Sequence, residues 1–126
     1  ILAKEKKIRE IVNNLQKKII KSNTRICVEG RDIASKILAK SPKYDLAFYF
    51  RCSLDVAAYR RWIDLKKSVS LKEVKKSLKM RTNLDKKRKN SPLIKVKDAI
   101  VIRSDQLNKK EVLLKMSKEI DKKIRN

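Results

Sequence analysis

The chain of 126 residues contains no histidine, so it has neither a histidine-centred catalytic triad nor a metal site with histidine ligands. Aromatic residues make up only 5% of the sequence and fall mostly in apolar segments, which leaves few platforms on which nucleic-acid bases could stack. No apolar run approaches the ~18 residues that a membrane span requires, and no signal peptide is recognisable. We therefore expect a protein of the cytoplasm without a membrane partner.

Cysteine and glycine are also scarce. Cys27 and Cys52 each lie in an apolar run, which favours two buried thiols in a reducing compartment over a disulfide. The one glycine, Gly30, lies in the stretch VEGRDI, between an apolar run and the pair Arg31-Asp32. Glycine permits a sharp turn or a close approach of the backbone to a ligand. An ordinary turn glycine followed by a surface ion pair is the alternative.

Positive charge, by contrast, is abundant, with 36 basic against 14 acidic residues and a formal net charge of +22. Such a charge is typical of proteins that bind nucleic acids. However, lysine outnumbers arginine by 26 to 10, and the lysines are spread over the whole chain. This distribution favours lysines on solvated helix faces, with a general attraction for polyphosphate ligands. A basic nucleic-acid-binding module is the alternative interpretation.

The spacing of apolar residues predicts helices that alternate with short buried strands. Ser53 is expected to cap the helix that follows it, and two S-x-x-E-like capping boxes, Ser70 with Glu73 and Asn108 with Glu111, predict two further helix starts. The predicted elements, in chain order, are a helix at 1–21, a strand at 25–29, a helical turn at 33–39, a strand at 45–50, helices at 54–67 and from 71 into the basic stretch 81–89, a strand at 99–102 and a helix from 109 to about 124.

This order predicts an α/β fold of one domain, with a parallel sheet and flanking helices. In such sheets ligands bind at the carboxyl ends of the strands. Gly30, Arg31 and Asp32 follow directly after the strand predicted at 25–29. These residues are therefore candidates for a ligand site.

A second candidate group is Arg81, Asp85 and Arg88, whose i, i+4, i+7 spacing places them on one face of a helix. Two guanidinium groups with a carboxylate between them could clamp phosphates. The alternative is an Arg–Asp pair on a solvated helix, which contributes a few tenths of a kcal/mol. Because lysine supplies most of the positive charge in this chain, arginine at these positions indicates a requirement for bidentate hydrogen bonds.

These motifs together resemble the bacterial cytidylate kinases, which transfer a phosphoryl group from ATP to CMP or dCMP. VEGRDI resembles the strand-end G-R-D motif of that family, and DLAFYF followed by Ser53 and Arg60-Arg61 resembles its next strand and helix. The spacing R-x-x-x-D-x-x-R that begins at Arg81, followed by S-P-L, resembles the family's lid. KDAIVI and the helix after it resemble the last strand and helix. The ordered set carries the resemblance, which covers most of the chain.

The resemblance implies roles for individual residues. Arg9 would hydrogen-bond the cytosine ring, and Asp32 would accept a hydrogen bond from the cytosine amino group. Arg31, Arg81 and Arg88 would contact nucleotide phosphates, and Asp85 would bind the sugar. CMP, dCMP and ATP would be the small-molecule partners of a monomeric enzyme that uses Mg²⁺, with no metal ligand expected from this chain and nucleic acid not expected as a partner.

The chain lacks the motif G-x-x-x-x-G-K-S/T with which this family cradles ATP phosphates, and a single glycine cannot make it. We therefore expect a C-terminal portion of the kinase, with the ATP and Mg²⁺ sites mainly upstream. The expected parts are the end of the monophosphate-binding region and a core helix (1–21), core strands and a helix (22–69), the lid (70–93) and the last strand and helix (94–126). A P-loop strand would separate the strands at 25–29 and 45–50.

Several positions depart from the family pattern. Ala34-Ser35 stands where Gly-Thr is usual, and Arg103 replaces an aspartate. Thr82, Asn83 and Leu84 stand where the lid usually carries more acidic residues and another arginine. These departures leave open a diverged paralogue that has kept the fold and lost activity.

Overall fold

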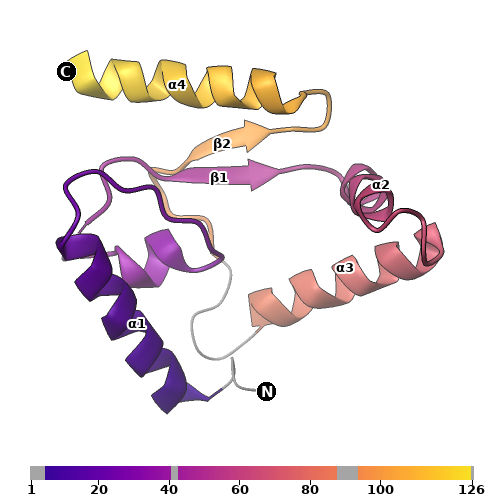
Figure 1. Ribbon diagram of the computed structural model, residues 1–126, viewed down its shortest axis with the longest axis horizontal. Helices are drawn as coiled ribbons and strands as arrows, with labels where there is room; N and C mark the ends of the chain where they lie inside the picture. Colours follow the sequence, from indigo (N-terminus) through magenta and orange to yellow (C-terminus); the bar gives the residue numbers. More distant parts are fainter. Residues whose placement is uncertain (1–4, 41–42, 88–93, 126) are drawn as a thin grey trace. The chain divides into compact units, whose positions relative to one another are not determined.

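The computed structural model describes residues 5–40, 43–87 and 94–125. The chain divides into two compact units, one made of Ile1–Asp45 and Asn83–Lys97 and the other of Leu46–Thr82 and Asp98–Asn126. Helices flank a small parallel sheet, so the predicted α/β class is confirmed (Figure 1). None of the helices in the described part of the chain is long and apolar enough to cross a membrane.

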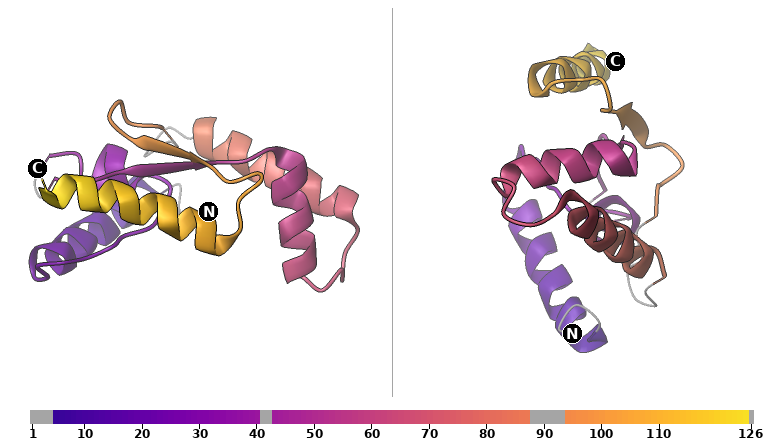
Figure 2. Two further views of the ribbon diagram at one scale, coloured as in Figure 1. Left: turned by 90° about the horizontal axis from the view of Figure 1, so that it is seen from above. Right: turned by 90° about the vertical axis from the view of Figure 1, so that its right-hand side faces the viewer.

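The second unit contains the sheet. Strands β1 (Phe48–Arg51) and β2 (Ile100–Arg103) pair in parallel, with Phe48 opposite Ile100 and Arg51 opposite Arg103. The connection between them contains helices α2 (Leu54–Asp64) and α3 (Leu71–Lys87), as a parallel pair requires a long crossover. Helix α4 (Lys109–Arg125) then runs alongside β2 (Figure 2). Both strands were predicted, and each lies one to three residues further along than expected.

Side chains begin the helices of this unit where the sequence predicts. The hydroxyl of Ser53 accepts a hydrogen bond from the backbone N–H of Val56 at 3.2 Å, and that of Ser70 accepts one from the N–H of Glu73 at 3.1 Å. The capping box at the start of α4 is reciprocal. Asn108 accepts from the N–H of Glu111 at 2.8 Å, and Glu111 accepts from the N–H of Asn108 at 3.1 Å.

Helix α2 ends three residues earlier than predicted. Lys66 and Lys67 have φ values of 55° and 57°, in the left-handed region that non-glycine residues rarely adopt. The indole N–H of Trp62 donates to the carbonyl of Val69 at 2.9 Å and holds the turn that follows. The ammonium group of Lys67 lies 4.9 Å from the centre of the Trp62 ring. The α2–α3 turn therefore combines two unfavourable backbone conformations with compensating side-chain contacts.

Replacing Lys66 with glycine tests this strain. Lys66→Gly removes the steric cost of the left-handed conformation, which exceeds the added entropy of glycine in the unfolded chain, so stability should rise by about 0.5 kcal/mol. Lys76→Gly, in the exposed middle of α3, should instead lower stability by about 0.5–1 kcal/mol. Urea unfolding of the whole protein measures both. Destabilisation by Lys66→Gly would contradict the assigned strain.

The turn after β2 is fastened to α2. Arg60 donates to the backbone carbonyls of Ser104, Asp105 and Leu107 at 2.6, 3.2 and 3.3 Å. A carboxylate oxygen of Asp105 accepts a hydrogen bond of 2.6 Å from the backbone N–H of Ser53. This hydrogen bond, more than any other contact, holds the pKa of Asp105 below its usual value of 3.8. The carboxylate therefore joins the start of α2 to the end of β2.

Acid should weaken this connection. Because the folded pKa of Asp105 lies below the unfolded one, its ionisation stabilises the fold above about pH 4 and this contribution is lost as pH falls through the folded pKa. Asp105→Asn keeps an oxygen acceptor and removes the charge. The wild-type protein should thus be the more stable of the two at pH 7, and the difference should shrink towards pH 3 in urea titrations. A difference that is independent of pH would contradict this role.

The first unit contains α1 (Lys6–Lys21) and η2 (Ile33–Ile37), a single π-helical turn at the place where a helical turn was predicted. Ser22 and Asn23 end α1 as expected, since both side chains donate to the carbonyl of Ile19, at 2.8 and 2.7 Å. The small core of this unit consists of Ile20, Ile37 and Leu38, packed against Val28, Ile33 and Tyr44.

The strand predicted at 25–29 is wrong. This segment runs without strand pairing, and the sheet of the described residues contains β1 and β2 alone. An apolar run forms a strand only where a neighbour satisfies its backbone groups. The predicted burial of the two cysteines is also wrong, because Cys27 and Cys52 are exposed free thiols. Cys27 lies within the unpaired segment, and Cys52 follows directly after β1.

Candidate functional site

Arg31 and Asp32 follow segment 26–30, which has no regular secondary structure, and lie directly before η2. Gly30 precedes them, and it does not have the positive φ that a left-handed turn would need. Its importance is spatial, because a Cβ atom on Gly30 would lie 2.7 Å from Cγ1 of Ile33. Glycine therefore lets Ile33 fold back against the backbone, and Ile33 packs on the core of the first unit. This contact fixes the path of Arg31 and Asp32.

Four of the six predicted site residues form two ion pairs in the first unit. Nη1 of Arg9, from α1, lies 3.7 Å from Oδ2 of Asp32, and each side chain is 14% exposed. Nη1 of Arg31 lies 2.7 Å from Oδ2 of Asp85, which α3 contributes. Because Arg31 and Asp32 are consecutive, the two pairs belong to one cluster. This four-residue cluster, Arg9, Arg31, Asp32 and Asp85, is the candidate site.

The Arg9–Asp32 pair is held loosely for a pair that is largely removed from water. Oδ2 of Asp32 is buried and accepts no hydrogen bond from the described residues, and 3.7 Å is too long for one to Arg9. A buried carboxylate oxygen without a hydrogen-bond donor is unfavourable by about 1–3 kcal/mol. Oδ2 of Asp32 therefore has an unused capacity to accept a hydrogen bond, with the Arg9 guanidinium group close by.

The remaining two predicted site residues, Arg81 and Arg88, are not part of this cluster. Arg81 lies on α3, in the part of the helix that belongs to the second unit. The helix runs through Lys87, so Arg81 and Asp85 share one helix as predicted. Arg88 lies outside the described residues.

In the sequence, Arg60-Arg61 contributed to the family resemblance, but neither residue was assigned a role. The three carbonyls that Arg60 binds give it a structural role, and a lone arginine on a helix carries no sequence signal for such contacts. Among the residues that the structure describes, no group of three or more Cys, Asp or Glu side chains could hold a metal ion.

Comparison with known proteins adds to this geometry. The sequence profile described as "Cytidylate kinase" matches residues 1–122. The chain is 34% identical to a cytidylate kinase of Alkaliphilus oremlandii over 115 residues, 89% of this chain and 51% of that protein. It is 32% identical to those of Rickettsia akari and Rickettsia africae over 123 residues, 93% of this chain and 55% of each relative. The chain thus spans about half the length of the curated relatives it matches.

Proposed function

The chain belongs to the cytidylate kinase family, and from this premise we propose that the whole protein transfers the γ-phosphoryl group of ATP to CMP or dCMP. The observation that carries the proposal is the four-residue cluster of the first unit, in which two arginines and two aspartates pair at the G-R-D motif. We further propose that the enzyme acts as a monomer in the cytoplasm.

Base recognition belongs to Asp32 and Arg9 in this proposal. The exocyclic amino group of cytosine donates hydrogen bonds, and uracil has a carbonyl oxygen in its place. The partly buried Asp32 carboxylate would accept from that amino group and repel the uracil carbonyl. Arg9 would donate to the acceptor atoms of the ring while keeping its attraction to Asp32. Buried polar groups matched to one base discriminate strongly against a base that leaves them unsatisfied.

The Arg31–Asp85 pair would bind the phosphate and the sugar of the nucleotide. Arg31 would exchange part of its contact with Asp85 for a bidentate contact with the phosphate, since guanidinium groups match carboxylate and phosphate oxygens alike. Asp85 would then accept from a sugar hydroxyl group. An ion pair that forms before the ligand arrives keeps both side chains in place, which lowers the entropic cost of binding.

Phosphoryl transfer needs positioning and positive charge more than a covalent group on the protein, because the transition state is loose and strongly anionic. A phosphate oxygen of CMP is the attacking atom. Arg31, Arg81 and Arg88 would stabilise the charge that develops. Mg²⁺ would shield the phosphates of ATP when bound. The segment 82–84, which lacks the further lid arginine, leaves fewer guanidinium groups for this task.

The test is ADP formation by the whole protein with ATP, Mg²⁺ and each of CMP, dCMP, UMP and AMP in turn. We expect turnover with CMP and dCMP and at least ten times less with UMP and AMP. No turnover from a well-folded protein would favour the diverged paralogue. Binding of unrelated RNA with a steep dependence on salt, without turnover, would favour the nucleic-acid-binding module.

A further inference from the structure

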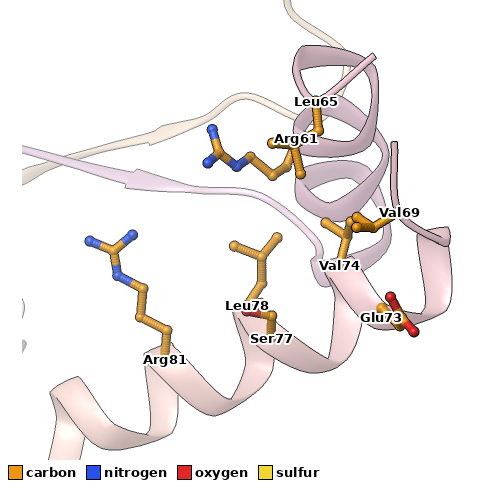
Figure 3. Close-up of a pocket in the computed structure, with 8 residues that line it drawn as sticks. All are labelled: Arg61, Leu65, Val69, Glu73, Val74, Ser77, Leu78 and Arg81. Atoms are coloured by element: carbon orange, nitrogen blue, oxygen red, sulfur yellow. The ribbon is translucent and has the colours of Figure 1, made fainter. Parts of the chain in front are cut away.

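The second unit contains a pocket of about 340 Å³ between α2 and α3, and Arg81 is the one residue of its lining that was predicted to contact a ligand (Figure 3). Arg61 from α2 and Arg81 from α3 line the pocket, and in this view their guanidinium groups extend to the same side, to the left of Leu78. The apolar wall of this arginine pocket is formed by Leu65, Val69, Val74 and Leu78. The carboxylate of Glu73 lies at the opposite end from the guanidinium groups.

Neither guanidinium group is neutralised within the described part of the chain. Arg61 and Arg81 have no ion pair or hydrogen bond there, whereas Arg9 and Arg31 are paired with aspartates and Arg60 with carbonyl groups. Asp55, an acidic residue of α2, forms its ion pair with Lys75 of α3 and not with either arginine. Two like charges on the same side of one pocket repel each other, and an anion bound between them would offset this repulsion. Their arrangement therefore favours an anionic ligand.

The helices that carry the two arginines are held together by several contacts. Asp55 of α2 forms an ion pair with Lys75 of α3, and the indole of Trp62 is fixed to the carbonyl of Val69 in the turn between the helices. Ala58 and Val74 are 1% and 4% exposed. The guanidinium groups thus extend from two fastened helices beside an apolar wall, and a wall of low dielectric strengthens their attraction for a charged ligand.

We propose that Arg61 and Arg81 together bind the phosphate groups of a nucleotide, which makes Arg61 a further phosphate-binding residue beside the lid arginine. Only the identity of the ligand as a nucleotide rests on the proposed function. Two planar guanidinium groups can each give a bidentate contact, and a chain of linked phosphates offers adjacent sets of oxygens for both. The phosphates could belong to the donor or the acceptor nucleotide, and the two sources are distinguished by titration.

The test is calorimetric titration of the whole protein with tripolyphosphate, ATP and CMP separately. Arg61→Ala should weaken tripolyphosphate binding about tenfold or more, since it removes charge-assisted hydrogen bonds, and Arg61→Lys should recover only part of the affinity because it restores the charge without the fork. Lys79→Ala is the matched control, because it removes one positive charge from α3 at a position that does not line the pocket. Weaker ATP but unchanged CMP binding assigns the donor, and the reverse assigns the acceptor.

Unchanged tripolyphosphate, ATP and CMP binding by Arg61→Ala would overturn the proposal. A loss equal to that of Lys79→Ala would also overturn it, because the effect would then be one of general charge. A double-mutant cycle with Arg81→Ala should show coupling between the two arginines, and strict additivity would contradict a shared ligand. Calorimetry measures binding without turnover. The proposal for the arginine pocket can therefore be correct even if the protein makes no CDP, and it can be wrong even if the protein does.

Discussion

Asp32→Ala in the whole protein is expected to lower kcat/KM for CMP by about a hundredfold or more and to leave the value for UMP little changed. The variant removes the acceptor for the cytosine amino group, and it leaves Arg9 without the carboxylate that lies 3.7 Å away. Loss of the hydrogen bond to a charged, largely buried acceptor is of the order of 1.5–3 kcal/mol. The positive charge of Arg9, left without its ion-pair partner, adds to this loss. The preference for CMP over UMP should therefore collapse, as measured by steady-state kinetics with both nucleotides.

Two further variants separate recognition from folding. Asp32→Asn keeps the shape of the side chain but offers an amide donor to the uracil carbonyl, so it should lower the CMP-to-UMP ratio and raise activity on UMP. Glu29→Ala removes an exposed carboxylate three residues earlier and should change neither. A CMP preference that survives Asp32→Ala, in a protein that still folds, would remove Asp32 from the site.

The helices were the part of the fold that the sequence predicted best, because their signals are local. Ser53, Ser70 and Asn108 each make their capping contacts within three residues, so the information that begins each helix lies at that point in the chain. The end of α2 was missed because Lys66 and Lys67 adopt a conformation that lysine does not signal. That conformation is imposed by contacts such as the one from Trp62 to Val69.

Strands depend on partners that often lie far away in the chain. Here the prediction of one such strand was confirmed and that of another was wrong. The run at 48–51 finds its neighbour at 100–103, whereas the equally apolar run at 25–29 stays unpaired. Apolar character alone does not distinguish the two cases. The four-residue cluster shows the same limit, since the sequence indicated the chemistry of Arg31 and Asp85 but not that they would pair across 54 positions.

A polypeptide of these 126 residues alone is expected to unfold gradually and to bind a hydrophobic dye such as ANS strongly. In the described residues β1 has one strand neighbour, and a two-stranded sheet is marginal in water. The apolar face of α1 is open to solvent, with exposed fractions from 38% to 65% at Ile8, Ile11, Val12, Leu15 and Ile19. Circular dichroism should show helix content without a steep thermal transition, while the whole protein should melt cooperatively.

A sharp melt with little dye binding would contradict this expectation. The exposed apolar residues of α1 would then have to be covered. Burying the surface that these five half-exposed side chains still present is favourable by about 1–2 kcal/mol each, so a cooperative fold of the chain alone must cover them. A second copy of the chain would be the cover available in a pure sample, and its melting temperature would then rise with protein concentration. Independence of concentration, together with a sharp melt, would instead require α1 to pack within its own chain. The four-residue cluster, which takes Arg9 from α1, would then be preformed in the polypeptide alone and should bind CMP without any further segment.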